Sequence, residues 1–168
     1  MSPDAAESPL VPIIVPDGEG PVLEAFGDTM QIKLGAEHTG GAFALGLITT
    51  PPGGGPPPHR HRNEDELLLV LEGRYRFLTS GEWTEVGPGG VIFIPRGAIH
   101  TYQNIGDTPS RHWVLATPSG FESFFRKCAV VFAEANAGPP NMPRLLNICG
   151  EYGIEFVPPL QGPADESA

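Results

Sequence analysis

The chain has 168 residues and a formal net charge of -10 at pH 7, from 10 Lys and Arg against 20 Asp and Glu. This length is typical of one domain with its own buried core, and the acidic balance argues against nucleic acid and anionic membranes as partners. The start, MSPDAAESPL, lacks a basic region followed by an apolar one, and no apolar run approaches the roughly 20 residues that cross a bilayer. Two cysteines are too few for a disulfide framework, so we expect a cytoplasmic protein.

Residues 1–20 are polar and rich in proline, with one apolar segment, VPIIVP, at 11–16. This N-terminal arm could add an edge strand, exchange with another copy or be poorly ordered. Short apolar segments then alternate with glycine and proline, which predicts a β-sandwich or barrel over 21–118. The expected strands are 29–34, 42–49, 66–72, 74–79, 83–86, 91–94, 100–104 and 112–117.

The pattern changes to a helical one over 119–168, which we expect to hold C-terminal helices and a tail. Ser119 and Glu122 predict a capping box, in which each side chain satisfies a backbone amide of the other. An apolar stripe follows at helical spacing and ends near residue 138; it consists of Phe121, Phe124, Phe125, Cys128 and Phe132. A second helix is expected over 142–152, and the two helices should cover one face of the barrel or join a dimer contact.

Titratable residues gather in GGGPPPHRHRNEDELLLVLEG, the segment 53–73. In a strand, His59 and His61 point to the same side, about 6.6 Å apart, which suits two ligands of one metal ion. The polar turn after them can reset the alternation, so that Glu66 also points inward at the base of the next strand. The apolar run 67–71 is continuous, which predicts a strand covered on both faces, by the barrel interior and by helices or a partner subunit.

The charged neighbours of these residues have simpler interpretations. Glu64 and Asp65 are interpreted as a solvated turn, although Asp65 could in principle replace Glu66 as a ligand. Arg60 and Arg62 alternate with the histidines and should point away from the site into surface ion pairs.

A second segment, GGVIFIPRGAIHTYQN at 89–104, places another histidine after a sharp turn. His100 begins a strand in which Tyr102 lies on the same side. Three histidines and a glutamate in this arrangement favour a metal site over a packed polar core. His38 and His112 lack such a context, and His112 is the better candidate for a place beside the pocket.

The two segments fit the patterns G-x5-H-x-H-x4-E-x6-G and G-x5-P-x-G-x2-H-x3-N, with 15 residues between them. This pair of motifs resembles the signature of the cupin superfamily. The resemblance implies an all-β fold, a jelly-roll barrel here followed by a small C-terminal helical extension. It also implies that one divalent metal ion is held by a set of four residues: His59, His61, Glu66 and His100. The chain further resembles single-domain cupins grouped with quercetin 2,3-dioxygenase.

Three imidazoles and one carboxylate would leave two positions open on an octahedral ion for a substrate, or for a substrate and dioxygen. Fe(II) is the favoured metal, with Ni(II), Mn(II), Co(II) and Zn(II) as alternatives. Glu66 is also the candidate catalytic base, since it could take a hydroxyl proton from an enolic substrate. A smaller set of side chains could line the substrate pocket: Phe77, Phe93, Tyr102, His112 and Trp113.

Three functions share this fold and site. The leading hypothesis is a metal-dependent dioxygenase acting on a flavonol-like or other enolic or aromatic small molecule. The alternatives are a non-redox isomerase, cyclase or dehydratase, and a module that binds a small molecule without turnover. The apolar arm and the doubly covered strand also predict a homodimer.

Overall fold

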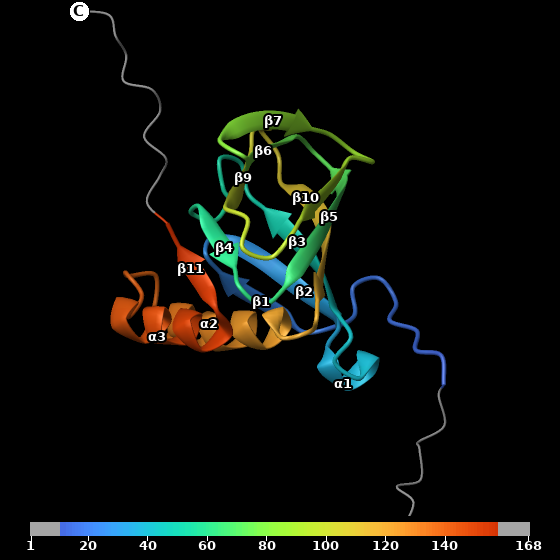
Figure 1. The fold of residues 1–168 in the computed structure, drawn as a ribbon, viewed down its shortest axis with the longest axis vertical. Helices are drawn as coiled ribbons and strands as arrows, with labels where there is room; N and C mark the ends of the chain where they lie inside the picture. Colours follow the sequence, from blue (N-terminus) through green and yellow to red (C-terminus); the bar gives the residue numbers. More distant parts are fainter. Residues whose placement is uncertain (1–10, 158–168) are drawn as a thin grey trace, which may run out of the picture.

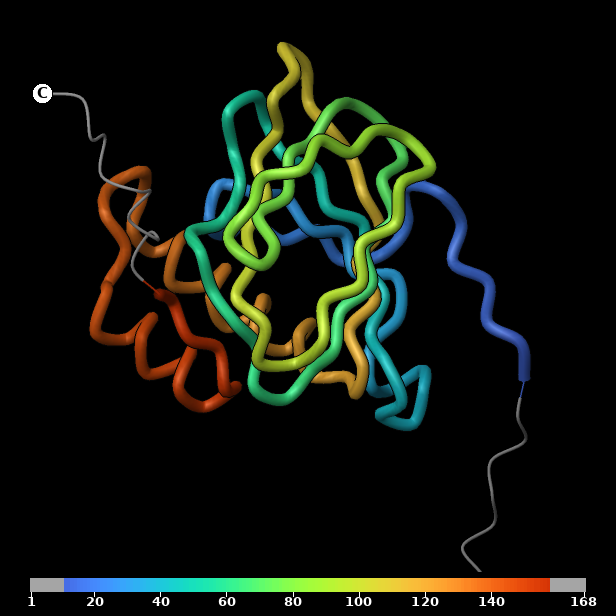
Figure 2. Tube along the Cα trace, turned by 45° about the horizontal axis from the view of Figure 1, so that its top comes forward, coloured from blue at the N-terminus to red at the C-terminus, as the bar shows by residue number. Residues whose placement is uncertain are grey.

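The computed structural model describes residues 11–157; the parts of the expected arm and tail at 1–10 and 158–168 lie outside the described residues. Two antiparallel sheets form the molecule, one in the order β1-β2-β3-β10-β5-β8 and the other in the order β11-β4-β9-β6-β7 (Figure 1). The strands close into a ring, and the C-terminal helices lie next to it (Figure 2). The predicted all-β jelly-roll barrel with a small C-terminal helical extension is therefore confirmed.

The strands follow the alternating apolar segments of the sequence. In chain order they are β1 Val22–Ala25, β2 Asp28–Leu34, β3 Ala44–Thr50, β4 His59–His61, β5 Asp65–Glu72, β6 Tyr75–Thr79, β7 Glu82–Val86, β8 Val91–Ile94, β9 His100–Asn104, β10 Ser110–Thr117 and β11 Ile154–Phe156. The helices are α1 Ala36–Thr39, α2 Phe121–Glu134 and α3 Met142–Tyr152. The sequence did not predict β1, β11 or α1, because each has four residues or fewer and, unlike β8, none of them is a continuous apolar run.

The apolar segment of the arm forms no strand in this structure. Its Val11, Ile13 and Ile14 side chains are exposed. The chain after it is held to the barrel by Lys33, whose Nζ donates to the carbonyl oxygens of Pro16 at 3.0 Å and Glu19 at 2.7 Å. Among the described residues, no helix is long and apolar enough to cross a membrane.

Helices α2 and α3 cover one end of the barrel (Figure 1). Phe124 and Phe125 of α2 pack with Ile48 and Val114 from the inner side of the six-stranded sheet in one buried cluster. The predicted capping box is wrong, because α2 begins after Gly120 and Ser119 forms no cap. Instead the buried Glu122 side chain accepts from the backbone N–H of Gly120 at 2.8 Å and from that of Ala36 in α1 at 3.0 Å.

The outer face of the six-stranded sheet is apolar and open at β5 and β8. Leu67 of β5 pairs with Phe93 of β8, and Val91 of β8 pairs with Leu69. Leu67 is 40%, Val91 59% and Phe93 63% exposed. Of the two covers predicted for the run 67–71, the helices do not serve, because they pack on the barrel end; cover by a partner subunit stays a prediction.

Candidate metal centre

The loop before β4 fixes the two histidines of that strand against β9. Gly53 N–H donates to the Asn104 carbonyl oxygen, and Asn104 N–H donates to that of Gly54, both at 2.9 Å. A Cβ atom on Gly55, whose φ is +146°, would overlap the carbonyl oxygen of Tyr102, so only glycine fits this approach. The two motifs are thus bound to each other through the backbone.

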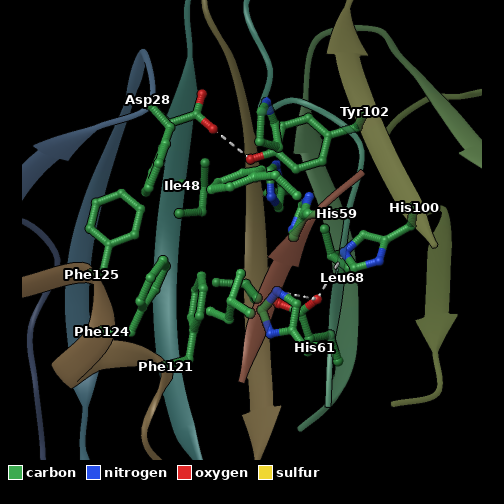
Figure 3. A pocket seen from close by; sticks show the side chains of 17 residues that line it. Asp28, Ile48, His59, His61, Leu68, His100, Tyr102, Phe121, Phe124 and Phe125 are labelled. Atoms are coloured by element: carbon green, nitrogen blue, oxygen red, sulfur yellow. Dashed lines mark hydrogen bonds and ion pairs between the residues drawn. The ribbon is translucent and has the colours of Figure 1, made fainter. Parts of the chain in front are cut away.

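Four predicted side chains meet inside the barrel. His59 lies opposite His100 in the pairing of β4 with β9, and Glu66 points inward from β5. His59, His61, Glu66 and His100 are all buried, and one potential ligand atom from each lies within 4.8 Å of the others. The Glu66 Oε2 atom is 3.1 Å from His100 Nε2 and 3.5 Å from His61 Nε2 (Figure 3). We refer to these residues as the four-residue cluster.

Backbone carbonyls select the ring nitrogens that face inward. His59 Nδ1 lies 2.9 Å from the Pro57 carbonyl oxygen, and His100 Nδ1 lies 3.0 Å from that of Ala98. A proton on each Nδ1 would be donated to these carbonyls, which leaves the Nε2 lone pairs directed at the cluster. Two imidazoles are therefore held in the form and orientation that a metal ion requires.

Behind His61 lies a carboxylate in place of a backbone carbonyl. Neither of its buried ring nitrogens has a hydrogen-bond partner, and its Nδ1 lies 3.5 Å from Glu64 Oε2, which is also unpartnered. Glu64 is only 4% exposed, so its interpretation as part of a solvated turn is wrong. The Gly120 backbone, before α2, lies near this carboxylate: a Cβ atom on Gly120 would be 3.5 Å from Glu64 Oε1. An ion bound by His61 Nε2 would give this nitrogen the partner that it lacks. The proton on Nδ1 would then face the Glu64 carboxylate, which would gain a partner as well.

The ionisation of the cluster also fits metal binding. Burial, with His100 and His61 nearby, lowers the pKa of His59 to about 3, so this imidazole is neutral at pH 7. Burial opposes ionisation of Glu66, but His61 and His100 outweigh it and lower its pKa to about 2. Burial would lower the pKa of His61, but Glu66 and Glu64 outweigh it and raise this pKa. A bound ion would displace the extra proton of the His61 imidazole, because only neutral imidazole ligates a metal. The donors thus fit one divalent ion.

The other charged residues of the motif lie outside the cluster. Asp65 accepts from Arg96, with Arg96 N–H at 2.7 Å from Oδ1, and so does not replace Glu66. Arg60 Nε donates to Glu155 Oε2 at 2.6 Å, and Arg62 pairs with the same carboxylate, in the surface pairs that the sequence predicted. His38 is exposed on α1, away from the site.

A cavity of about 50 Å³ adjoins the four-residue cluster. Its walls are largely apolar, and the side of α2 contributes Phe121, Phe124 and Phe125. Tyr102 and His112 line it, as the sequence suggested. The sequence reasoning assigned the α2 phenylalanines only to packing and did not single out Asp28, which also lines the cavity.

The other three pocket candidates lie elsewhere, contrary to the prediction. Phe77 is buried in a separate core cluster with Leu68 and Tyr75. Phe93 points outward from β8, as its exposure shows. Trp113 follows the inward His112 on β10, so the strand alternation turns it to the outer face.

A second polar group lies across the cavity from His61 and His100 (Figure 3). The Tyr102 hydroxyl donates to Asp28 Oδ2 at 2.6 Å, and the Asp28 carboxyl is 5% exposed. Asp28 is placed there by a two-residue hairpin turn, Phe26 and Gly27, whose φ angles of 57° and 83° suit a tight turn between β1 and β2. Burial raises the pKa of Asp28 to about 6, against the opposing effect of the Tyr102 and Thr50 hydroxyls.

Comparison with known proteins agrees with this arrangement. Residues 46–115 match the model of the Cupin domain family. Quercetin 2,3-dioxygenase of Bacillus subtilis (strain 168) is 29% identical over 124 residues, which are 74% of this chain; the chain spans about a third of that protein, 35%.

Solved structures give the same fold. The polyketide cyclase RemF of Streptomyces resistomycificus is similar at a TM-score of 0.57 and 27% identity, over 65% of this chain and 81% of that one. A predicted oxalate decarboxylase of Thermotoga maritima is similar at a TM-score of 0.58 and 23% identity, over 63% of this chain and 99% of that one.

The fold and the site define a small jelly-roll barrel that carries three histidines and a glutamate in its interior. Both motifs lie on the strands and loops that build this site, and the family model spans β3 to β10 with all four residues. Residues 46–115 therefore form a cupin domain, and the described chain has the jelly-roll fold of that superfamily.

Proposed function

We propose that this protein is a metal-dependent dioxygenase acting on a small enolic or hydroxylated aromatic compound. The observation that carries the proposal is the buried four-residue cluster at one end of an aromatic-walled cavity. The similarity to a quercetin 2,3-dioxygenase supports the redox chemistry and the substrate class. One divalent ion, with Fe(II) favoured, is the proposed cofactor.

The chain's own residues have distinct tasks in such a reaction. A divalent metal bound by the cluster would supply Lewis acidity and, where the ion is redox-active, a place for electron exchange. Glu66 is ionised and lies beside the His100 and His61 nitrogens, so its carboxylate can take a substrate hydroxyl proton. The phenylalanines of α2 exclude water from the reacting group.

The cavity size bears on the substrate. About 50 Å³ holds only a few water molecules. A cavity of this size is closer to a small enolic or single-ring compound than to a three-ring flavonol, and the α2 phenylalanines form the wall that a larger ligand would meet. Small enolic or single-ring compounds are therefore favoured over flavonols.

A second candidate is a non-redox cyclase, isomerase or dehydratase. The specific observation in its favour is the similarity to the polyketide cyclase, which covers most of that protein at an identity close to that of the dioxygenase match. In this case Glu66 would again move a proton, and the metal would only polarise a carbonyl.

The test is metal analysis of protein purified without added metal, followed by aerobic and anaerobic assays of the metal-loaded protein. The panel holds flavonols, single-ring catechols and enolic diketones, with oxygen uptake and product measured together. We expect product only in air, with about one dioxygen consumed per product. Equal product without oxygen would refute the dioxygenase and support the second candidate, whereas ligand binding without any product would refute both.

A further inference from the structure

The end of the cavity opposite the four-residue cluster carries an acidic group that the proposed reaction does not use. Asp28 and Tyr102 both line the cavity, and they come from opposite sheets, β2 and β9. Figure 3 shows Asp28 on one side of the cavity, His61 and His100 on the other, and the Tyr102 hydroxyl between them. A ligand that reaches across the cavity would contact both ends.

The carboxylate of Asp28 is far from saturated. It can accept about four hydrogen bonds, yet it accepts one bond of normal geometry, from Tyr102. Its buried Oδ1 atom has no hydrogen bond of normal geometry; the Thr50 hydroxyl lies close enough to oppose the rise in the Asp28 pKa but forms no such bond either. Such a buried carboxylate is costly in a site that only needs packing, so it calls for a partner that completes its bonding, and a ligand in the cavity can supply one.

The direction of the existing bond determines which ligand group fits. The Tyr102 proton is used in the bond to Asp28 Oδ2, so the Tyr102 oxygen can then only accept. Ionised Asp28 also only accepts. The pair therefore offers acceptors and no free donor, so it complements a ligand hydroxyl and opposes a ligand carbonyl or carboxylate.

We propose that Asp28 and Tyr102 form a second binding point of the cavity, which selects substrates that carry a hydroxyl group remote from the oxygens facing the four-residue cluster. The substrate class is then a hydroxylated aromatic or enolic compound with polar groups at two ends and an apolar body between the phenylalanines of α2. The proposal rests on the proposed function for one point, the chemical groups of the substrate that face the four-residue cluster. The acceptor pair itself does not depend on the reaction.

The test compares ligands that differ by a single remote hydroxyl. Catechol is paired with hydroxyquinol, and galangin with kaempferol, and each is titrated calorimetrically into the metal-loaded protein without oxygen, so that no turnover occurs. We expect the ligand with the extra hydroxyl to bind about tenfold more tightly or better in at least one pair, as for a hydrogen bond to a charged acceptor. Equal affinities within both pairs would overturn the proposal without any variant.

A variant then locates the effect. Asp28→Asn keeps the shape of the side chain, and its oxygen can still accept the Tyr102 hydrogen bond. Its amide N–H₂ replaces the second carboxylate oxygen, so the preference for the ligand with the extra hydroxyl should fall to about twofold or less. Asp107→Asn makes the same chemical change at an exposed turn and should keep the preference. Metal content is measured for both. A preference that survives in metal-loaded Asp28→Asn would overturn the assignment.

Two failures remain distinguishable. Hydroxyl selection without oxygen uptake on any ligand would refute the proposed function and support the binding point. Oxygen uptake with no hydroxyl selection would do the reverse.

Discussion

The buried Asp28 carboxyl should make the stability of the fold depend on pH in an unusual direction. Most carboxyl groups in folded proteins stabilise the fold when ionised, but burial raises the pKa of Asp28 from its ordinary 3.8 to about 6. Ionisation therefore costs folding free energy. The contribution of Asp28 to the free energy of unfolding is fully present below about pH 3.8, where the carboxyl is protonated in the folded and the unfolded state. This contribution is lost as the pH rises through about 6.

The magnitude follows from those two values. A difference between 3.8 and about 6, at about 1.4 kcal/mol for each pH unit, corresponds to about 3 kcal/mol at neutral pH. About 1 kcal/mol of this cost is already present at pH 4.5, so about 2 kcal/mol develops between pH 4.5 and pH 7.5. The Asp28→Asn side chain does not ionise, so this cost is absent. Relative to the wild type, its free energy of unfolding should therefore rise by about 2 kcal/mol between pH 4.5 and pH 7.5.

The measurement is urea unfolding of wild type and Asp28→Asn at several pH values, followed by circular dichroism. Metal is removed with a chelator first, because a bound ion would add its own pH-dependent stabilisation. Asp107→Asn serves as the surface control and should stay parallel to the wild type. A difference between Asp28→Asn and wild type that is constant within about 0.5 kcal/mol from pH 4.5 to pH 7.5, against the expected 2, would refute the buried, weakly satisfied carboxyl.

Four further outcomes are expected. His61→Ala or His100→Ala should abolish uptake of the divalent ion, measured by elemental analysis, while circular dichroism shows an intact β domain, because apolar strands hold the core; full occupancy in either would exclude that residue as a ligand. Glu64→Gln should weaken metal affinity by roughly 10- to 100-fold in a chelator competition, as for other groups that orient a ligating histidine, and unchanged affinity would contradict this role. Glu66→Gln, compared with wild type at equal measured occupancy, should be slower by about 10² to 10⁴ if the carboxylate is the base; a rate within about threefold would leave it a ligand at most. We also propose that the bare outer face pairs with a second copy, so wild type should scatter light as a dimer and Phe93→Lys as a monomer, since a buried lysine would be unpaired; a wild-type monomer at all concentrations would refute it.

Local spacing explains why the four-residue cluster was predictable. His59 and His61 are two residues apart on one short strand, and Glu66 and His100 begin or nearly begin the next strands of their motifs. Strand alternation and turn chemistry are sufficient to direct all four inward. The jelly roll was predictable for the same reason, since its longer strands alternate and its turns contain glycine and proline.

Long-range contacts decided what the sequence could not show. Glu64 looks like a turn residue in the sequence, yet it is buried beside His61 and lies near the chain before α2, which is far away in the sequence. Asp28 follows a short hairpin whose first strand was too short to recognise, and its partner Tyr102 is 74 positions away. Phe93 and Trp113 were assigned to the pocket by residue type, although the register of β8 and β10 turns them outward.

Strand β9 connects the two polar ends of the cavity. His100 and Tyr102 are two residues apart on it, so both point inward, one into the four-residue cluster and the other to Asp28 across the barrel. Asn104, next on the same face, fixes the end of this strand, since its Nδ2 donates to the carbonyl oxygens of Thr50 at 2.9 Å and Thr108 at 2.8 Å. A shift of one residue in the register of β9 would turn His100 and Tyr102 outward together. The register of this one strand therefore sets the metal-facing end, the hydroxyl-selecting end and the distance between them.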